Sequence, residues 1–161
     1  MSYKAYQPVY LTFERGVLRE FQTRALARWP NEHLEFLVGT WSRGIAHVEY
    51  SRVCKLVHSS VRGCSFNYED RDQIIAEALA DGLLVVGDLH THPFTWKHHQ
   101  HYTPEIREDL AWPSATDWLE HQGKRYITGI ARVLEWPSRR KTWKFKFFGP
   151  LVPVRVLREQ P

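Results

Sequence analysis

Two histidines separated by a single residue are the clearest chemical feature of the sequence. His90 and His92 lie in the run GDLHTHP, directly after the continuous apolar stretch LLVVG at 83–87. Alternate residues of an extended segment point the same way, so both imidazoles can converge on one ion while Thr91 faces away. Imidazole nitrogen suits Zn²⁺, and a catalytic zinc takes three protein ligands and keeps one position open for water. The spacing therefore predicts two of three zinc ligands.

A second short motif supplies a candidate for the third ligand. In the run PSATD, Ser114 and Asp117 are three residues apart. On the first turn of a helix, this spacing brings both side chains to one end of the element, where Asp117 can bind the metal and Ser114 can point its hydroxyl at the open position. The same spacing is also a capping-box signature. Capping and metal binding are compatible, since a cap fixes the geometry that a ligand needs.

Taken together, the two motifs resemble those of the JAMM metalloproteases, also called the JAB or MPN-plus domain. The family pattern is a Glu ahead of a strand, then His-x-His-Pro, then Ser-x-x-Asp. This chain has His90-Thr91-His92-Pro93 followed by Ser114-x-x-Asp117. The matching order of helix, Glu, strands and His-x-His extends from about residue 14 to 120.

The resemblance also assigns a catalytic glutamate. In the family, the Glu commonly stands seven residues before a Gly that closes the strand. Counting back from Gly39 gives Glu32 in the run PNEHLEFLVG. Glu35 is the alternative, but it falls where the family usually has a small residue inside the strand. Glu32 is therefore the preferred candidate.

The resemblance implies a role for each motif residue. His90, His92 and Asp117 would hold Zn²⁺, which lowers the pKa of bound water to about 7. Glu32 would take the proton of the water and pass it to the leaving amine. Ser114 would donate a hydrogen bond to the developing oxyanion. The implied reaction is amide hydrolysis without a covalent enzyme intermediate.

The family also implies a class of substrate and of partner. Its typical substrate is the bond after the C-terminal tail of ubiquitin or a ubiquitin-like protein, often an isopeptide bond to lysine. A short chain of this kind looks most similar to the bacterial JAB peptidases, some of which act beside E1- and E2-like enzymes in antiphage systems. We therefore expect an isopeptidase that acts on a ubiquitin-like modifier or its conjugate, with an E1- or E2-like enzyme or its target as a further candidate partner.

One segment departs from the family pattern. Twenty residues, Phe94 to Pro113, separate the two motifs, where the family usually has well under a dozen. We expect this insertion, at about 94–112, to lie beside the metal and to cover the site or recognise the substrate. Its histidines, His98, His99 and His101, are either substitute ligands or solvated loop residues.

The elements that would position these residues follow from hydrophobic periodicity. Helices are predicted over 14–29, 70–80 and 114–122, and strands over 34–38, 44–50, 52–57, 83–87, 125–133, 141–148 and 151–157. This order predicts a single α+β domain, residues 1–161, with a mixed twisted sheet packed by helices. The resemblance makes the fold more specific: a JAB/MPN (cytidine-deaminase-like) fold, which is α/β/α sandwich-like.

Composition excludes several other classes. The 161 residues hold no apolar run near the roughly 20 that a membrane span needs. The first residues lack the apolar stretch of a signal peptide, and two cysteines are too few for a disulfide scaffold, so we expect a cytoplasmic protein.

Basic charge is concentrated near the carboxyl terminus. The net charge is +4, but residues 124–148 alone carry eight basic residues against one acidic residue. The run KTWKFKFFG alternates lysines with aromatic residues, which is typical of a half-exposed strand. The same segment can dock an acidic protein, or, in an alternative interpretation, stack nucleic-acid bases. A non-catalytic MPN-type scaffold is the remaining alternative.

Overall fold

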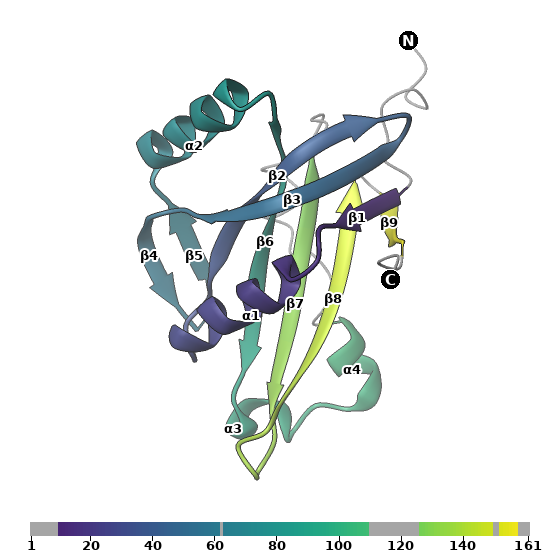
Figure 1. Cartoon of the computed structure of the whole chain (residues 1–161). Helices are drawn as coiled ribbons and strands as arrows, with labels where there is room; N and C mark the ends of the chain where they lie inside the picture. Colours follow the sequence, from purple (N-terminus) through teal and green to yellow (C-terminus); the bar gives the residue numbers. More distant parts are fainter. Residues whose placement is uncertain (1–9, 62, 110–125, 150–151, 158–161) are drawn as a thin grey trace.

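The computed structural model describes residues 10–61, 63–109, 126–149 and 152–157. Within these residues, strands predominate over helices (Figure 1). The strands are β1 (Tyr10–Phe13), β2 (Leu34–Ser42), β3 (Ile45–Val53), β4 (Leu56–Ser60), β5 (Gly63–Phe66), β6 (Leu84–Phe94), β7 (Ile127–Glu135), β8 (Lys141–Gly149) and β9 (Val152–Val156). The helices are α1 (Val17–Ala27), α2 (Tyr68–Ala80), α3 (Trp96–His99) and α4 (Pro104–Asp109).

Seven of the strands form a closed barrel, and the predicted α/β/α sandwich-like JAB/MPN fold is therefore wrong. The strand order is β1-β3-β2-β6-β7-β8-β9, while β4 and β5 form a separate two-stranded sheet. The sheet is mixed, as expected, because β6 pairs with β7 in parallel and with β2 in antiparallel orientation. A sandwich would leave two free sheet edges, whereas here both ends of the sheet meet.

Closure depends on β1, a strand that the sequence pattern did not predict. This strand has only four residues, and it pairs in parallel with β3 on one side and with β9 on the other. The second pairing joins Tyr10 and Leu11 to Arg155 and Val156, near opposite ends of the chain. Local periodicity carries no signal for a contact across so large a separation, which explains the error in fold class.

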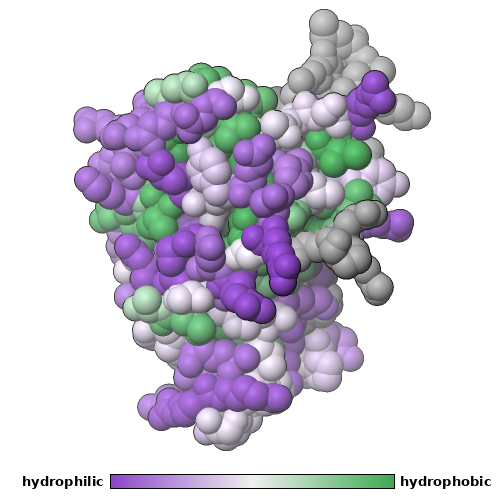
Figure 2. Space-filling view, viewed as in Figure 1, coloured by the Kyte–Doolittle hydropathy of each residue, from purple (hydrophilic) through white to green (hydrophobic). Residues whose placement is uncertain are grey.

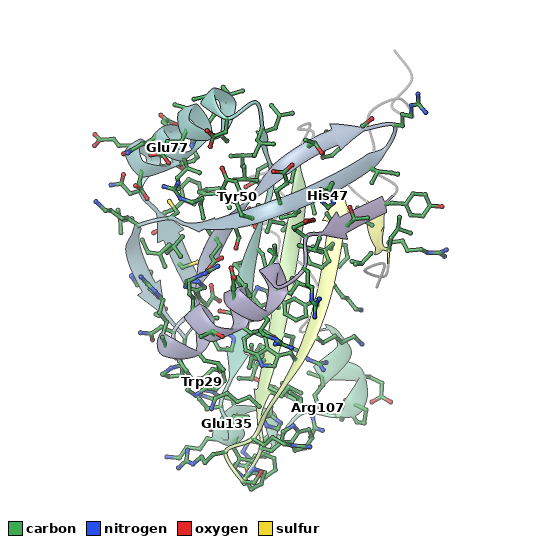
Figure 3. All side chains as sticks on the ribbon, viewed as in Figure 1. Trp29, His47, Tyr50, Glu77, Arg107 and Glu135 are labelled. Carbon is green, nitrogen blue, oxygen red and sulfur yellow. The ribbon has the colours of Figure 1, made fainter. Side chains whose placement is uncertain are left out.

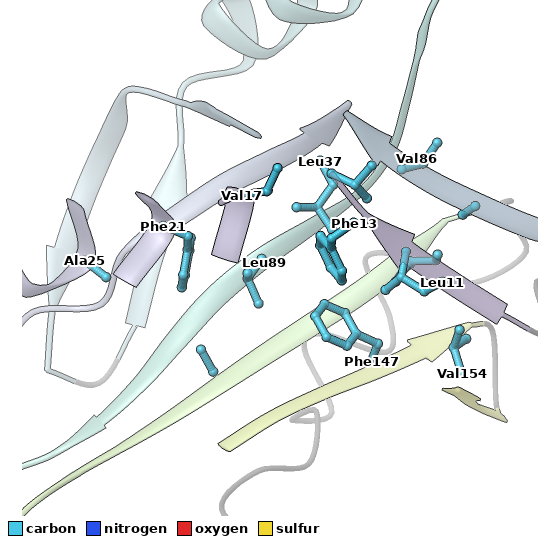
Figure 4. Packing of buried hydrophobic residues seen from close by; sticks show 14 residues of the cluster. Leu11, Phe13, Val17, Phe21, Ala25, Leu37, Val86, Leu89, Phe147 and Val154 are labelled. Carbon is cyan, nitrogen blue, oxygen red and sulfur yellow. The ribbon is translucent and has the colours of Figure 1, made fainter. Parts of the chain in front are cut away.

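Helix α1 covers one face of the sheet, as its amphipathic pattern predicted. Val17, Phe21 and Ala25 are all buried, while the helix ends at Ala27, before Pro30. The three side chains pack with Leu89 of β6 and Phe147 of β8 in one apolar cluster (Figure 4). We call this side of the sheet the α1 face.

Helix α2 packs on the opposite side of the sheet through a narrow apolar stripe. Ile74 and Ala78 are buried, while Leu79 is exposed. The helix begins after Asn67, which caps it: its side chain accepts a hydrogen bond from the Asp70 N–H. Asn is among the best N-cap residues because its oxygen satisfies an unpaired backbone donor.

Two strands are longer than the sequence indicated. The predicted strand 34–38 continues through Gly39 to Ser42, with a register shift between Val38 and Gly39. Strand β6 runs on to Phe94 because β7 pairs alongside it over its whole second half. The two histidines therefore lie within a strand rather than at its exit.

The late strands agree closely with prediction. β7, β8 and β9 fall within two residues of the predicted 125–133, 141–148 and 151–157. The two strands expected over 44–50 and 52–57 are instead one continuous strand, β3, followed by β4.

None of the described helices is long and apolar enough to cross a membrane. Seen from the side of α1, polar side chains cover most of the surface and apolar ones form small, separate groups (Figure 2).

Gly39 provides a test of the close contact between β2 and β3. A Cβ atom at this position would overlap the main-chain carbonyl of His47, whereas a Cβ at Gly63 meets nothing. We expect Gly39→Ala to lower the free energy of unfolding by about 2–4 kcal/mol, because backbone has to move. Urea denaturation measures the change. The matched control Gly63→Ala should stay within about 0.5 kcal/mol, and equal losses in the two variants would contradict the contact.

Candidate functional site

His90 and His92 lie side by side on β6. Their ring centroids are 5.0 Å apart with an interplanar angle of 60°. His90 is 6% exposed and His92 is half-buried. Leu89 between Asp88 and His90 belongs to the cluster under α1, so strand alternation places both imidazoles on the other side of the sheet. We call this side the histidine face.

Asp88 supplies a carboxylate on β6 itself, two residues before His90. It is 2% exposed, and its Oδ1 lies 3.4 Å from His90 Nδ1. A carboxylate at this nitrogen fixes the ring orientation and favours the tautomer that carries a proton on Nδ1. His90 Nε2 is then the nitrogen that would coordinate an ion.

The pairing of β2 with β6 determines which residues stand opposite the histidines. Leu34 is the register partner of His90. Beyond it, two hydrogen bonds continue the pairing: the Thr91 N–H donates to the His33 carbonyl at 2.9 Å, and the His33 N–H donates to Thr91 Oγ1 at 2.8 Å. Glu32 lies two residues before Leu34, in the segment that leads into β2.

Glu32 is itself held by the small β4–β5 sheet. Its N–H donates to the Ser60 carbonyl at 2.8 Å, and its carbonyl accepts a hydrogen bond from Ser59 Oγ at 2.8 Å. Only 8% of Glu32 is exposed. The two hydrogen bonds with β4 thus fix the main chain of Glu32 just before β2.

Glu35, the alternative to Glu32, lies on the α1 face and is already engaged there. Its carboxylate accepts hydrogen bonds from Arg24 Nε at 2.6 Å and Ser51 Oγ at 2.5 Å, and lies 2.8 Å from His33 Nε2. Burial raises its pKa, but the hydrogen bonds from His33, Arg24 and Ser51 outweigh burial and hold the pKa at about 2. Glu35 therefore anchors α1 to the sheet, on the side away from the histidines.

Two of the predicted site residues, Ser114 and Asp117, lie outside the described residues, as does the predicted helix 114–122. Within the described part of the chain, no group of three or more His, Cys, Asp or Glu side chains is arranged to hold a metal ion. The structure thus brings together His90 and His92, while the third ligand and the general base stay predictions.

The histidines of the insertion do not join the pair on β6. His99 is fully buried, and its Nε2 contacts the Glu135 carbonyl at the far end of β7. Its ring packs between Trp96 and Trp136, with centroid distances of 4.9 and 5.1 Å. His98 and His101 are exposed. The insertion thus builds an aromatic cluster at the end of the sheet where Figure 3 shows Glu135 and Arg107.

Three cations lie on the histidine face, and sequence reasoning did not connect them with the two histidines. Arg132 of β7 is the register partner of His92, and Lys144 of β8 is the partner of Arg132. Lys146 of β8 pairs with Ile130 of β7, and Ile130 is the register partner of His90. Arg132 Nη1 donates to the Arg107 carbonyl of α4 at 2.5 Å. Only the pairing of β7 with β6 brings this charge to the histidines.

The aromatic residues between those lysines face the other way. Trp143, Phe145 and Phe147 pack against the cluster under α1, and the first two stack with ring centroids 5.9 Å apart. Base stacking needs an exposed aromatic face beside the cations. On β8 the aromatic residues and the lysines lie on opposite faces. The alternation in the sequence that suggested nucleic-acid binding therefore does not place aromatic rings beside the lysines.

Comparisons with known proteins give the fold and nothing more. No family model and no curated protein matches the chain. The solution structure of protein DSY2949 from Desulfitobacterium hafniense is similar over 91% of both chains, with a TM-score of 0.63 and 17% identity. A protein from Salinibacter ruber is similar over 93% of this chain and 94% of its own, with a TM-score of 0.53 and 21% identity. These matches add no support for the JAMM resemblance.

The assignment of Glu35 to α1 anchoring predicts a pH-dependent loss of stability. Its pKa is lower in the folded chain than the ordinary 4.5, so its contribution is complete above about pH 4.5 and is lost as the pH falls towards 2. We expect Glu35→Gln to lower the free energy of unfolding at pH 7 by about 3 kcal/mol. Urea denaturation at pH 7 and pH 3 should show the difference from wild type shrinking at the lower pH.

The control for that experiment is the exposed Glu20, which lies 3.9 Å from the same Arg24. Glu20→Gln should leave stability almost unchanged, because exposed ion pairs are screened by water. Equal stability of Glu35→Gln and wild type at pH 7 would contradict the anchoring role.

Proposed function

We propose that the protein is a zinc-dependent peptidase that hydrolyses an amide bond with the carboxylate of Glu32 as general base. The observation that carries this proposal is the pair of adjacent imidazoles on β6, with the buried residue Glu32 in the segment that leads into the neighbouring strand β2. The barrel differs from the fold that the JAMM resemblance implied, so the proposal depends on the site and its motifs rather than on the fold.

The donor set fits a zinc ion. Two imidazoles on one strand and one carboxylate make a three-ligand set that leaves a position for water, as catalytic zinc sites require. His90 and His92 would supply the nitrogens and Asp117 the oxygen. Asp88 at 3.4 Å from His90 Nδ1 would keep that ring oriented. When bound, the metal would supply Lewis acidity and lower the pKa of water.

The remaining chemistry belongs to residues of the chain. Glu32 would accept a proton from the attacking water and deliver it to the leaving amine, which makes departure of the amine possible. Its backbone N–H and carbonyl are held by Ser60 and Ser59 of β4, which fixes the position of its main chain before substrate binds. Ser114 would donate a hydrogen bond to the oxyanion as charge develops there.

The substrate that the JAMM-like motifs favour is a ubiquitin-like modifier joined through its C-terminus to a target protein. An extended tail of this kind can add a strand to a sheet edge and so present its last carbonyl in a fixed position. An E1- or E2-like enzyme or its conjugate is the partner class that follows from this activity, in the cytoplasm.

Loss of single ligands tests the metal site. We expect purified wild type to contain about one zinc per chain, and His92→Ala and Asp117→Ala to lose most of it, because removing a ligand weakens a zinc site strongly. Metal content after dialysis measures this. The control His101→Ala removes an exposed histidine of the insertion and should keep full zinc. Retention of zinc by Asp117→Ala would contradict the third ligand.

Substitution of the general base tests the reaction. Glu32→Gln should keep its zinc but lower kcat by at least about 100-fold on a fusion of a ubiquitin-like protein to a short peptide, with KM nearly unchanged. Glu49→Gln, at an exposed position of β3, is the matched control and should keep wild-type kcat. Hydrolysis that resists both a chelator and Glu32→Gln would refute the proposal.

A further inference from the structure

We propose that Thr12, His47 and Glu14 form a second reactive site, in which the Thr12 hydroxyl takes the acyl group of a small activated ester such as an aryl acetate. We call these three side chains the Thr12 site. The proposal goes beyond the peptidase function and does not rest on it, because the reaction uses none of the candidate zinc ligands.

The three side chains have the geometry of a nucleophile, a base and a group that orients the base. Thr12 Oγ1 lies 2.6 Å from His47 Nδ1. On the other side of the imidazole ring, His47 Nε2 lies 3.3 Å from Glu14 Oε2. A hydroxyl within hydrogen-bond reach of an imidazole, with a third group orienting the ring, is the arrangement that activates a serine or threonine nucleophile.

The carboxylate of Glu14 selects which ring nitrogen of His47 acts as the base. An ionised carboxylate only accepts hydrogen bonds, so the contact at 3.3 Å favours the neutral tautomer that carries its proton on Nε2. The other nitrogen, Nδ1, then presents its lone pair to the Thr12 hydroxyl, which donates to it at 2.6 Å. This is the tautomer that can remove the hydroxyl proton, and the adjacent carboxylate stabilises the imidazolium that forms.

Strand pairing brings the three residues together. In the parallel pairing of β1 with β3, Thr12 is the register partner of His47. The Glu14 N–H donates to the Val48 carbonyl at 2.7 Å, which continues the pairing past the end of β1. On its other side, β3 pairs with β2, where Thr40 is the partner of His47. The backbone on which each of the three side chains stands is therefore fixed by the barrel.

The Thr12 site faces solvent because the residues next to it form the core. Four neighbours on the two strands are buried in the cluster under α1: Leu11, Phe13, Ala46 and Val48. Alternate residues of a strand point to opposite faces, so Thr12 and His47 point out of the barrel. The His47 side chain is 36% exposed, that of Glu14 is 63% exposed, and Thr12 is half-buried. A small ester can therefore reach the hydroxyl from solvent.

The Thr12 site is separate from the pair of histidines on β6. Thr40, the partner of His47, lies on the same strand as Leu34, the partner of His90. The two partners are six residues apart on β2, which is about 20 Å along an extended strand. Figure 3 shows His47 where β3 runs beside β1.

The reaction is an acyl transfer in two steps. The Thr12 oxygen bonds to the carbonyl carbon of the ester while the hydroxyl proton moves to His47 Nδ1. The bond from that carbon to the aryl oxygen then breaks, and the aryl oxygen takes the proton from Nδ1 and leaves as a phenol. Water cleaves the acyl-Thr12 ester by the same route and releases the acid. Activated esters are the matching class of donor, because an aryloxide is a weak base that leaves readily.

Acetylation by p-nitrophenyl acetate tests the Thr12 site. Peptide mass mapping after short incubations locates the acetyl groups, and hydroxylamine removes an acetyl ester of threonine but not an acetyl amide of lysine. We expect Thr12 to be acetylated about 100-fold faster than Thr23, an exposed threonine of α1 whose hydroxyl donates to the Arg19 carbonyl. Equal rates at the two threonines, or no acetyl group on Thr12, would overturn the inference. This comparison is made within wild type and needs no variant.

Substitution of the base gives the sharper comparison. His47→Gln should slow acetylation of Thr12 about 100-fold, because the group that removes the proton is lost. The matched control Thr40→Ala changes the neighbour of His47 on β2 and should keep the wild-type rate. A wild-type rate in His47→Gln would refute the site.

Glu14 is a positioning residue, so its test relies on rescue by the conservative variant. Glu14→Gln should slow acetylation of Thr12 about fivefold, a modest effect because the ion pair is exposed. Glu14→Asp keeps the carboxylate and should restore most of the rate, which a purely structural role would not require. A wild-type rate in Glu14→Gln would contradict the role of the carboxylate.

A chelator separates this inference from the proposed function. Neither the chelator nor Glu32→Gln should change acetylation of Thr12, because the Thr12 site contains no zinc ligand. Rapid acetylation in a protein that cuts no peptide would support the site while the peptidase proposal fails. Acetylation of Thr12 that disappears with the chelator would overturn the inference.

Discussion

The antiparallel register between β2 and β6 is the constraint on which the rest of the site depends. It is fixed by the ladder from Leu34 onward and by the two hydrogen bonds between His33 and Thr91. A slip of one residue would exchange the faces of every side chain on β2. Glu35 would then leave Arg24 and enter the histidine face. One pairing thus decides both the anchoring of α1 and the composition of the candidate active site.

The individual helices and strands could be predicted from the sequence, but the closure of the sheet into a barrel could not. The period of Val17, Phe21 and Ala25 gave α1, and the alternation in KTWKFKFFG gave β8, because each element satisfies its own hydrophobic pattern. The barrel instead requires Tyr10 and Leu11 to pair with Arg155 and Val156. A four-residue strand has too little pattern to be recognised, and its partners are set by tertiary packing. The prediction of a sandwich was wrong because this pairing closes the sheet.

The candidate site likewise has parts that a local sequence pattern predicts and parts that depend on the pairing of distant strands. The spacing of His90 and His92 indicates a shared face whatever the surrounding fold, and the structure places both there. The choice between Glu32 and Glu35 depended on a count from Gly39, which lies inside β2 rather than at its end. From the sequence, Arg132 could be recognised only as one member of the basic segment 124–148. Its place beside His92 comes from a parallel pairing across forty residues, which sequence pattern alone does not specify.

Strand β8 separates the residues that stabilise the core from those that carry charge. The residues that hold the strand in the core alternate with those that point to the histidine face. Mutation can therefore change Lys144 or Lys146 to a neutral or acidic residue while Trp143, Phe145 and Phe147 keep the same packing. The two alternating sets of side chains on this strand can therefore be varied independently of one another: one set determines the packing of the barrel and the other its surface charge.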